Sequence, residues 1–276
     1  MIKKTIGFTV FLLLYGAQLL AQCTGIDFYT NTPNGCVPHL AKFTATGFPS
    51  GSEFSWDFGT GYSSQSSSDS SKVNVFTIAG FYTIKLKVFL PLGGTCVITK
   101  NNYVTVGNKP VPVFTVNNTL ICNGADTITF TDNTPKSMSR DWIIDGVVYN
   151  NGPAVIKHFF NFSGYKSVTL IVRDSLGCQG ITSKDSVVRV VSKPTIDFTA
   201  SSVAGCNPRN VTFTPNVTNL GTQSIVSYIW TMTGSNTPIS NAVTPSVVYA
   251  NPGLYSVTLN VITDVGCNYS FTRTNY

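Results

Sequence analysis

The chain has 276 residues, and only 11% of them are charged, against about 25% in an average soluble domain. Its net charge of +6 comes from lysines and arginines spread along the whole sequence, without an arginine cluster or a basic stripe. This pattern argues against nucleic acid binding, which requires a concentrated basic surface.

Residues 1–21 have the pattern of a signal peptide. Lys3 and Lys4 form a basic segment, an apolar stretch follows, and Ala21 offers a small residue for cleavage. A retained membrane anchor is the alternative, but Thr5 to Ala21 is short of the roughly 20 apolar residues that span a bilayer. We expect a secreted or cell-surface protein with no membrane span after cleavage. Lipid anchoring at Cys23 is a less favoured alternative, because Gln22 is larger than the residue wanted at that cleavage site.

One phrase, Gly-x-Tyr-x-(Ile/Val)-x-Leu-x-Val or a close variant, occurs three times, starting at Gly80, Gly164 and Gly253. Strict alternation of apolar and polar residues predicts a β-strand with one face in a core. The starts are 84 (164 − 80) and 89 (253 − 164) residues apart, and such a period predicts tandem copies of one small domain.

Other markers recur in register with this strand. A tryptophan precedes each glycine, namely Trp56, Trp142 and Trp230. An aromatic residue lies four positions before each glycine, namely Phe76, Phe160 and Tyr249. A phenylalanine opens each copy, namely Phe28, Phe114 and Phe198. Lys109-Pro110 and Lys193-Pro194 mark the joints, since proline favours extended backbone there. We expect domains at 24–107, 108–191 and 192–276.

The third domain is expected to lack part of its last strand. Its sequence ends 9 residues after Cys267 (276 − 267), without the closing Val-x-Val that the other two copies have. We therefore expect a piece of a longer parent chain with further domains, and an open sheet edge in the third copy.

Six of the seven cysteines fall at matched points of the repeat. Cys36, Cys122 and Cys206 precede the second strand of each copy, while Cys96, Cys178 and Cys267 follow the alternating strand. Because each copy carries its own pair, we expect the disulfides Cys36–Cys96, Cys122–Cys178 and Cys206–Cys267, with Cys23 left over. Metal binding is disfavoured, because the chain has no CxxC pair and only two histidines, His39 and His158.

The run Trp56-Asp-Phe-Gly-Thr-Gly61 and the phrase Gly80-x-Tyr82-x-Ile-x-Leu-x-Val88 resemble the PKD (polycystic kidney disease) domain. This resemblance implies an all-β chain of three tandem immunoglobulin-like β-sandwiches. Trp56, Trp142 and Trp230 would fill the three cores, with Tyr82 and Tyr255 facing them, whereas copy two has Lys166 at that place. The Gly-Cys-x-Pro variant is similar to PKD arrays in surface proteins of Bacteroidetes-type bacteria.

An immunoglobulin-like strand order leaves the cysteine pairing open. The two cysteine-bearing segments of one copy would then lie near opposite ends of the sandwich, whereas bridged Cα atoms lie within about 7 Å of each other.

The sequence offers no catalytic constellation. Asp132, Asp141 and Asp145 form a loose acidic cluster in copy two, for which a solvated edge is favoured over a calcium site, and no partnered Ser or Cys accompanies the histidines. We expect no enzymatic activity, no metal and no cofactor.

The expected function is a non-catalytic extracellular spacer or adhesion array of a bacterial cell-surface protein that contacts a protein or a glycan. The alternative is an accessory array of a secreted polysaccharide- or protein-degrading enzyme. The ligand-binding residues are unknown; exposed aromatics for a glycan would come from Phe48, Phe54, Tyr62 and the stretch 159–162.

Overall fold

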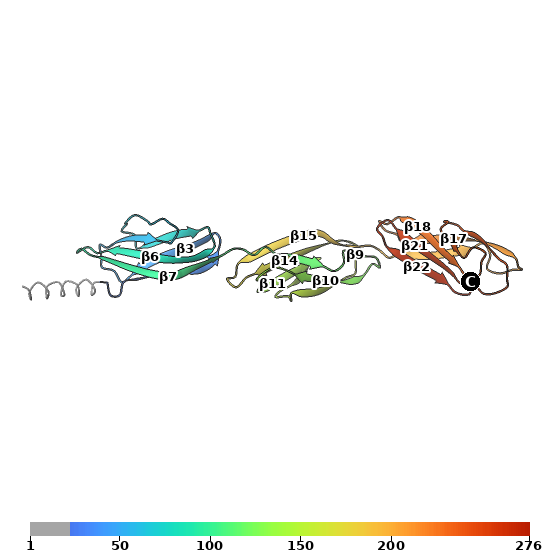
Figure 1. Cartoon of the computed structure of the whole chain (residues 1–276), viewed down its shortest axis with the longest axis horizontal. Coiled ribbons are helices and arrows are strands. Elements are labelled where there is room, and N and C mark those ends of the chain that lie inside the picture. The colour runs from blue at the N-terminus through green and yellow to red at the C-terminus, as the bar shows by residue number, and fades with distance from the viewer. Residues whose placement is uncertain (1–22) are drawn as a thin grey trace, which may run out of the picture. The chain divides into compact units, whose positions relative to one another are not determined.

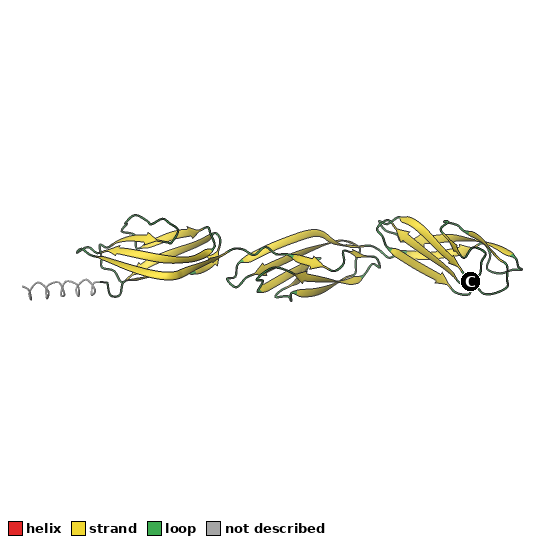
Figure 2. Ribbon diagram, in the orientation of Figure 1, coloured by secondary structure: helices red, strands yellow, loops and turns green. Residues whose placement is uncertain are grey.

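The computed structural model describes residues 23–276, and this part of the chain is all-β, with strands joined by turns and no helix (Figure 2). The predicted signal peptide, residues 1–21, lies outside the described residues. The strands form sheets that pack face to face, which confirms the expected β-sandwich fold (Figure 1).

The first sandwich has a three-stranded and a four-stranded sheet. Their orders are β1-β3-β5 and β2-β7-β6-β4, with β1 at Asp27–Thr30, β2 at Asn34–Cys36, β3 at His39–Thr46, β4 at Glu53–Asp57, β5 at Ser71–Phe76, β6 at Gly80–Phe89 and β7 at Thr95–Gly107. β2 runs parallel to β7, and the other pairs are antiparallel. Two sheets with this strand order correspond to the immunoglobulin arrangement.

The second sandwich repeats this order, with one short strand added at the edge of its larger sheet. Its sheets are β13-β10-β8 and β12-β11-β14-β15-β9, with β8 at Phe114–Val116, β9 at Leu120–Ile121, β10 at Asp126–Asp132, β11 at Ser139–Ile144, β12 at Val147–Tyr149, β13 at Val155–Phe160, β14 at Gly164–Arg173 and β15 at Gln179–Val190. The short strand β9 again pairs in parallel with the last long strand, β15.

The third sandwich differs at its last strand. Its sheets are β16-β17-β20 and β19-β18-β21-β22, with β16 at Thr195–Ala200, β17 at Arg209–Thr218, β18 at Ile225–Met232, β19 at Ile239–Ser240, β20 at Ser246–Tyr249, β21 at Val257–Thr263 and β22 at Asn268–Arg273. β22 has 6 residues where β7 has 13 and β15 has 12. Within residues 191–276, no strand takes the place of β2 or β9.

The repeated phrase forms the strand that its alternation predicts. In β6 the side chains of Ile84, Leu86 and Val88 are buried, while Lys85 and Lys87 are exposed. The indole rings of Trp56, Trp142 and Trp230 are all buried among phenylalanine rings from the facing sheet. Each copy thus builds one aromatic core between its two sheets.

By contact density the chain divides into two compact units, which cut across the second sandwich. One unit contains residues up to Pro112 together with 134–139 and 171–181. The other contains 113–133, 140–170 and 182–276. Each unit holds one disulfide that joins two consecutive copies.

The disulfides do not follow the expected pairing within copies. The structure has Cys36–Cys178, Cys122–Cys267 and Cys23–Cys96, and it leaves Cys206 as the free, exposed cysteine of the described chain. The expected bonds Cys36–Cys96, Cys122–Cys178 and Cys206–Cys267 are therefore wrong, as is the expectation that Cys23 is left over.

The length of the last strand explains why these disulfides join consecutive copies. In the first sandwich Cys36 pairs with Gly107 at the end of β7, while Cys96 lies near the start of the same strand. The 11 residues between those positions (107 − 96) span about 36 Å of extended chain, whereas bridged Cα atoms are 5.5 Å apart in Cys36–Cys178. The cysteines that precede β3 and β10, Cys36 and Cys122, therefore bond with the late cysteine of the next copy.

Candidate functional site in the third sandwich

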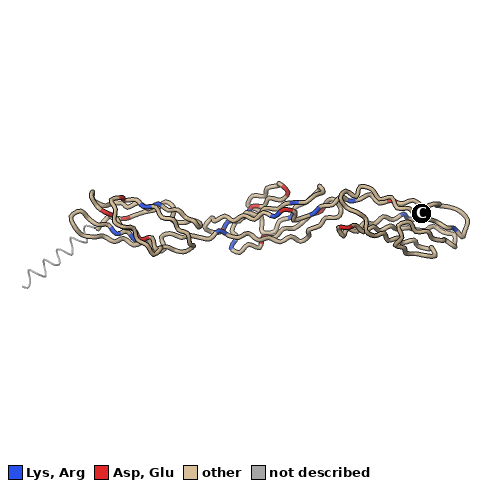
Figure 3. The backbone as a smooth tube through the Cα atoms, turned by 90° about the horizontal axis from the view of Figure 1, so that it is seen from above, with Lys and Arg blue, Asp and Glu red and all other residues tan. Residues whose placement is uncertain are grey.

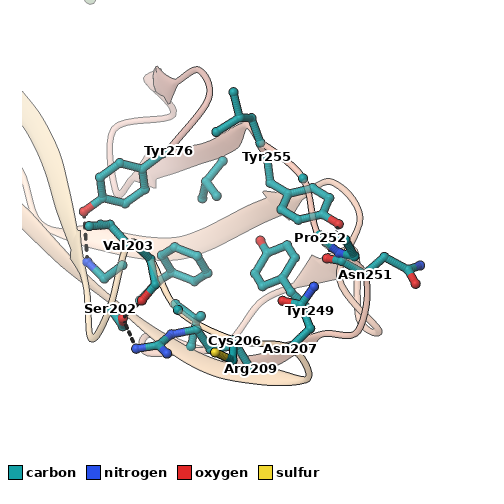
Figure 4. A pocket seen from close by; sticks show the side chains of 18 residues that line it. Ser202, Val203, Cys206, Asn207, Arg209, Tyr249, Asn251, Pro252, Tyr255 and Tyr276 are labelled. Atoms are coloured by element: carbon teal, nitrogen blue, oxygen red, sulfur yellow. Dashed lines mark hydrogen bonds between the residues drawn. The ribbon is translucent and has the colours of Figure 1, made fainter.

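A groove of about 430 Å³ opens into the core of the third sandwich (Figure 4). Its walls come from the segment before β17, from the loop between β20 and β21, and from the end of the described chain. The lining residues used below are Cys206, Arg209, Phe213, Tyr249, Tyr255 and Tyr276.

One wall of the groove is held by a cation stacked on aromatic rings. The Arg273 guanidinium lies 4.8 Å from the ring centroid of Tyr276 and 5.6 Å from that of Phe198, and it donates a hydrogen bond of 2.8 Å to Asp197. This hydrogen bond holds the pKa of the Asp197 carboxyl below its ordinary value. The Tyr276 hydroxyl accepts a hydrogen bond from the Ala200 amide, which fixes the ring at the rim.

The groove also contains buried polar atoms without partners. Tyr249 is only 7% exposed, and its hydroxyl points into the groove with no hydrogen-bond partner within the described residues (Figure 4). Burial, together with neighbouring Tyr255, raises the pKa of this phenol. The Arg209 Nε atom is likewise buried and unpaired, although its Nη2 donates to Ser202 Oγ. An unpaired buried polar group costs about 1–3 kcal/mol, so an occupant with polar backbone atoms would be favoured here.

The tyrosine of the repeated phrase ties its strand to the preceding loop. The Tyr82 hydroxyl donates to the carbonyl of Ile78 over 2.6 Å, and the Tyr255 hydroxyl donates to that of Asn251 over 2.8 Å. Both acceptors lie four residues upstream, as in the tyrosine corner of immunoglobulin-like domains. These two tyrosines are partly buried and structural.

Copy two replaces this tyrosine by a buried lysine that forms an ion pair with an exposed aspartate. The Lys166 side chain is 8% exposed, and its Nζ donates to Asp145 Oδ2 over 2.8 Å. In copy two the charged pair therefore ties the strand to the turn after the tryptophan strand, and not to the loop before the strand.

The other acidic residues of copy two also have structural partners. Asp132 forms an ion pair with Arg140 over 2.7 Å, and Asp141 accepts a hydrogen bond from the Asn151 amide. No group of three metal-ligating side chains is found among residues 23–276.

The two histidines lie in different copies, each with its own hydrogen bond. His39 Nε2 lies 2.9 Å from the Thr32 carbonyl, and His158 Nδ1 lies 2.7 Å from the Tyr149 hydroxyl. Burial lowers the pKa of His158, which favours its neutral form.

The aromatic residues considered for glycan binding divide between core and surface. Phe54 and Phe160 are buried, Phe48 is partly buried, and Tyr62, Phe159 and Phe162 are exposed.

Lysines and arginines are interspersed with acidic residues along the backbone (Figure 3). No helix in the described range is long and apolar enough to cross a membrane.

Sequence reasoning missed one repeated feature of the cores. A cation lies over the opening phenylalanine in every copy: Lys100 over Phe28, Lys184 over Phe114 and Arg273 over Phe198. The signal was a basic residue on the last strand, four residues before Val104 and Val188 in the first two copies.

Residues 191–276 match the family model of the PKD domain. The match thus falls on the third copy, whereas the motif resemblance is strongest in the first. No curated protein matches the chain.

Several solved structures are similar to the chain, all at low identity. The fibronectin(III)-like modules of Clostridium thermocellum CbhA are 16% identical, cover 60% of this chain and 94% of their own, with a TM-score of 0.36. A 1.5-MDa bacterial ice-binding adhesin is 12% identical, covering 90% and 96%, with a TM-score of 0.38. A marsupial T cell receptor is 10% identical, covering 90% and 99%, with a TM-score of 0.41. Scores this low carry no conclusion about function.

Proposed function

We propose that the chain is a non-catalytic extracellular array of three PKD-type domains, which serves a bacterial cell-surface protein as a spacer that resists extension and presents adhesive loops. The observation that carries this proposal is the pair of disulfides Cys36–Cys178 and Cys122–Cys267, because each joins one copy to the next. Three disulfides also favour an oxidising compartment outside the cytoplasm. The bond from Cys23 to Cys96 occupies the thiol that a lipid anchor would need.

The overlapping disulfides shorten the path that a pulling force takes through the chain. From Cys23 the path crosses to Cys96, follows the backbone for 26 residues (122 − 96) to Cys122, and crosses to Cys267. Even with every strand unfolded, those residues extend to only about 90 Å. Without disulfides, the 244 residues from Cys23 to Cys267 (267 − 23) would extend to about 850 Å.

Single-molecule pulling on the mature chain tests the spacer role. We expect the oxidised chain to stop extending near the short limit, and the reduced chain to release several hundred ångströms. The paired variant Cys122→Ser/Cys267→Ser opens the path to 102 residues (36 − 23 plus 267 − 178), or about 350 Å. Cys36→Ser/Cys178→Ser is the matched control, because it leaves the shortest path unchanged. An oxidised chain that extends as far as the reduced one would contradict the spacer role.

The adhesive role is tested separately by screening residues 22–276 against glycans and extracellular matrix proteins. A specific ligand whose binding is lost on replacing exposed Tyr62 or Phe162 by Ala would support it. Reproducible turnover of a glycan, ester or peptide substrate, lost on replacing Asp141 or His158, would overturn the non-catalytic assignment.

A further inference from the structure

The groove of the third sandwich lies where the other two sandwiches hold the end of their last strand. In the first, Val104 and Val106 of β7 are buried in the core, four and six residues after Lys100. In the second, Val188 and Val190 of β15 are buried, four and six residues after Lys184. Residues 191–276 contain no counterpart of these two valines.

The boundaries of the groove support this correspondence. In the first sandwich Gly80 and Tyr82 of β6 pair with Val106 and Val104, while Gly35 and Cys36 of β2 pair with Val106 and Gly107. The counterparts of these four residues are Gly253, Tyr255, Gly205 and Cys206, and all four line the groove. The groove is therefore bordered by both of the chain segments that a strand of the β7 type would pair with.

The position of Tyr276 fixes where such a strand would enter. Thr30 N donates to the Tyr103 hydroxyl just as Ala200 N donates to that of Tyr276, and each tyrosine lies three residues after the cation over its phenylalanine ring. Tyr276 is thus the counterpart of Tyr103, and a strand that enters the groove here would take the positions that Val104–Gly107 have in the first sandwich.

The buried hydroxyl of Tyr249 is a second, independent indication of an occupant. Its counterparts are Phe76 and Phe160, which carry no polar atom, so this hydroxyl is a feature of the third copy alone. It points into the groove without a partner, where the N–H and C=O groups of an added strand would come within reach (Figure 4).

The cysteine pairing adds the chemistry of a covalent bond. The cysteine that precedes β3 or β10 bonds with the late cysteine of the next copy in both Cys36–Cys178 and Cys122–Cys267. Cys206 is the third member of this series, and it is exposed and free.

We propose that the third sandwich is the acceptor for a further PKD-type domain, whose leading Val-x-Val strand fills the groove and whose late cysteine forms a disulfide with Cys206. The strand pairs parallel to the Gly205–Cys206 segment and antiparallel to Gly253–Tyr255, and it buries two β-branched side chains beside Phe213. Two thiols lose two protons and two electrons to a disulfide oxidant, which is reduced to two thiols. This inference rests on the proposed array but not on its adhesive role.

The test extends the chain with its own sequence. Because Tyr276 corresponds to Tyr103, residues 104–191 are appended directly after Tyr276, with the appended Cys122 replaced by Ser so that the addition brings one new thiol. The protein is refolded with oxidised and reduced glutathione and mapped by non-reducing peptide analysis. We expect Cys206 to be linked to the appended Cys178 and no free thiol to remain; a folded appended copy beside a free Cys206 would overturn the proposal.

A shorter extension tests the groove without the disulfide. Appending only Val-Thr-Val-Gly, the sequence of residues 104–107, should slow amide exchange at 253–255 by about tenfold or more. The matched control carries Asp at both valine positions and should leave the exchange unchanged. Equal exchange in the Val and Asp versions would rule out the strand site. Pulling on the unextended chain depends only on its three existing disulfides, so the spacer role can fail or hold independently.

Discussion

The hydroxyl of Tyr269, in the third sandwich, donates a hydrogen bond of 2.6 Å to the carbonyl oxygen of Cys122, in the second. The bond lies beside the disulfide between Cys122 and Cys267 and joins the same two copies. Burial raises the pKa of the Tyr269 phenol, so the hydroxyl remains a donor up to alkaline pH.

Replacing Tyr269 by Phe should lower the free energy of unfolding by about 1–2 kcal/mol, because the Cys122 carbonyl loses its donor and Gln223 Oε1 loses one of its two donors. Urea denaturation of the oxidised protein measures this change. Tyr29→Phe is the control, since Tyr29 is exposed, and should change stability by less than about 0.5 kcal/mol. Equal effects of the two substitutions would show that the hydrogen bonds of the Tyr269 hydroxyl contribute nothing to stability.

The native, oxidised protein should contain one reactive thiol per chain. Cys206 is exposed, and the other six cysteines are in disulfides. A chromogenic disulfide reagent should therefore release one equivalent of product without denaturant, and Cys206→Ser should abolish the reaction. A reactive thiol at Cys23 or Cys96 in its place would contradict the pairing.

Replacing Asp145 by Asn should destabilise the chain by about 1–3 kcal/mol, because the buried Lys166 ammonium loses its counter-charge. The double variant Asp145→Asn/Lys166→Tyr places a tyrosine at the position of Tyr82 and should recover most of that loss. The stabilities of the two variants are compared by their midpoints of denaturant unfolding. A double variant less stable than Asp145→Asn would show that the tyrosine does not fit in copy two.

The ion pair between Asp197 and Arg273 should make part of the stability depend on acidic pH. The hydrogen bond from Arg273 lowers the pKa of Asp197 in the folded chain, so its contribution is present above the unfolded value near 3.8 and is lost as the pH falls through the folded value. Asp197→Asn should therefore narrow the difference in stability between about pH 5 and pH 2.5. An unchanged difference would mean that the carboxylate gains nothing from the pair.

The fold could be predicted from the sequence because its signals are local. The alternation at residues 80–88 has the period of a strand, and the recurring tryptophans mark the core of each copy. The pairing of cysteines could not be predicted, since it depends on which end of the sandwich each one reaches. In the first copy this is set by the length of β7. Cys96 lies near one end of this strand, and Gly107, which pairs with Cys36 in the sheet, lies at the other end.

The groove could be predicted only in part. The missing Val-x-Val after Cys267 indicated an open sheet edge. Tyr249, however, holds the same position in the repeat as Phe76 and Phe160, so the sequence offered no reason to distinguish it from them. Only the spatial arrangement shows that its hydroxyl is buried without a partner.

The overlap of the three disulfides also determines what a protease can achieve. A single backbone cut anywhere from Cys23 to Cys267 separates two partners of at least one bond, because the bonds 23–96, 36–178 and 122–267 together span every peptide in that range. The two pieces therefore stay joined, and fragments should appear on a gel only after reduction. Release of any part of this segment takes either a second cut or a reductant, so nicks in its exposed loops do not by themselves shed the domains beyond them.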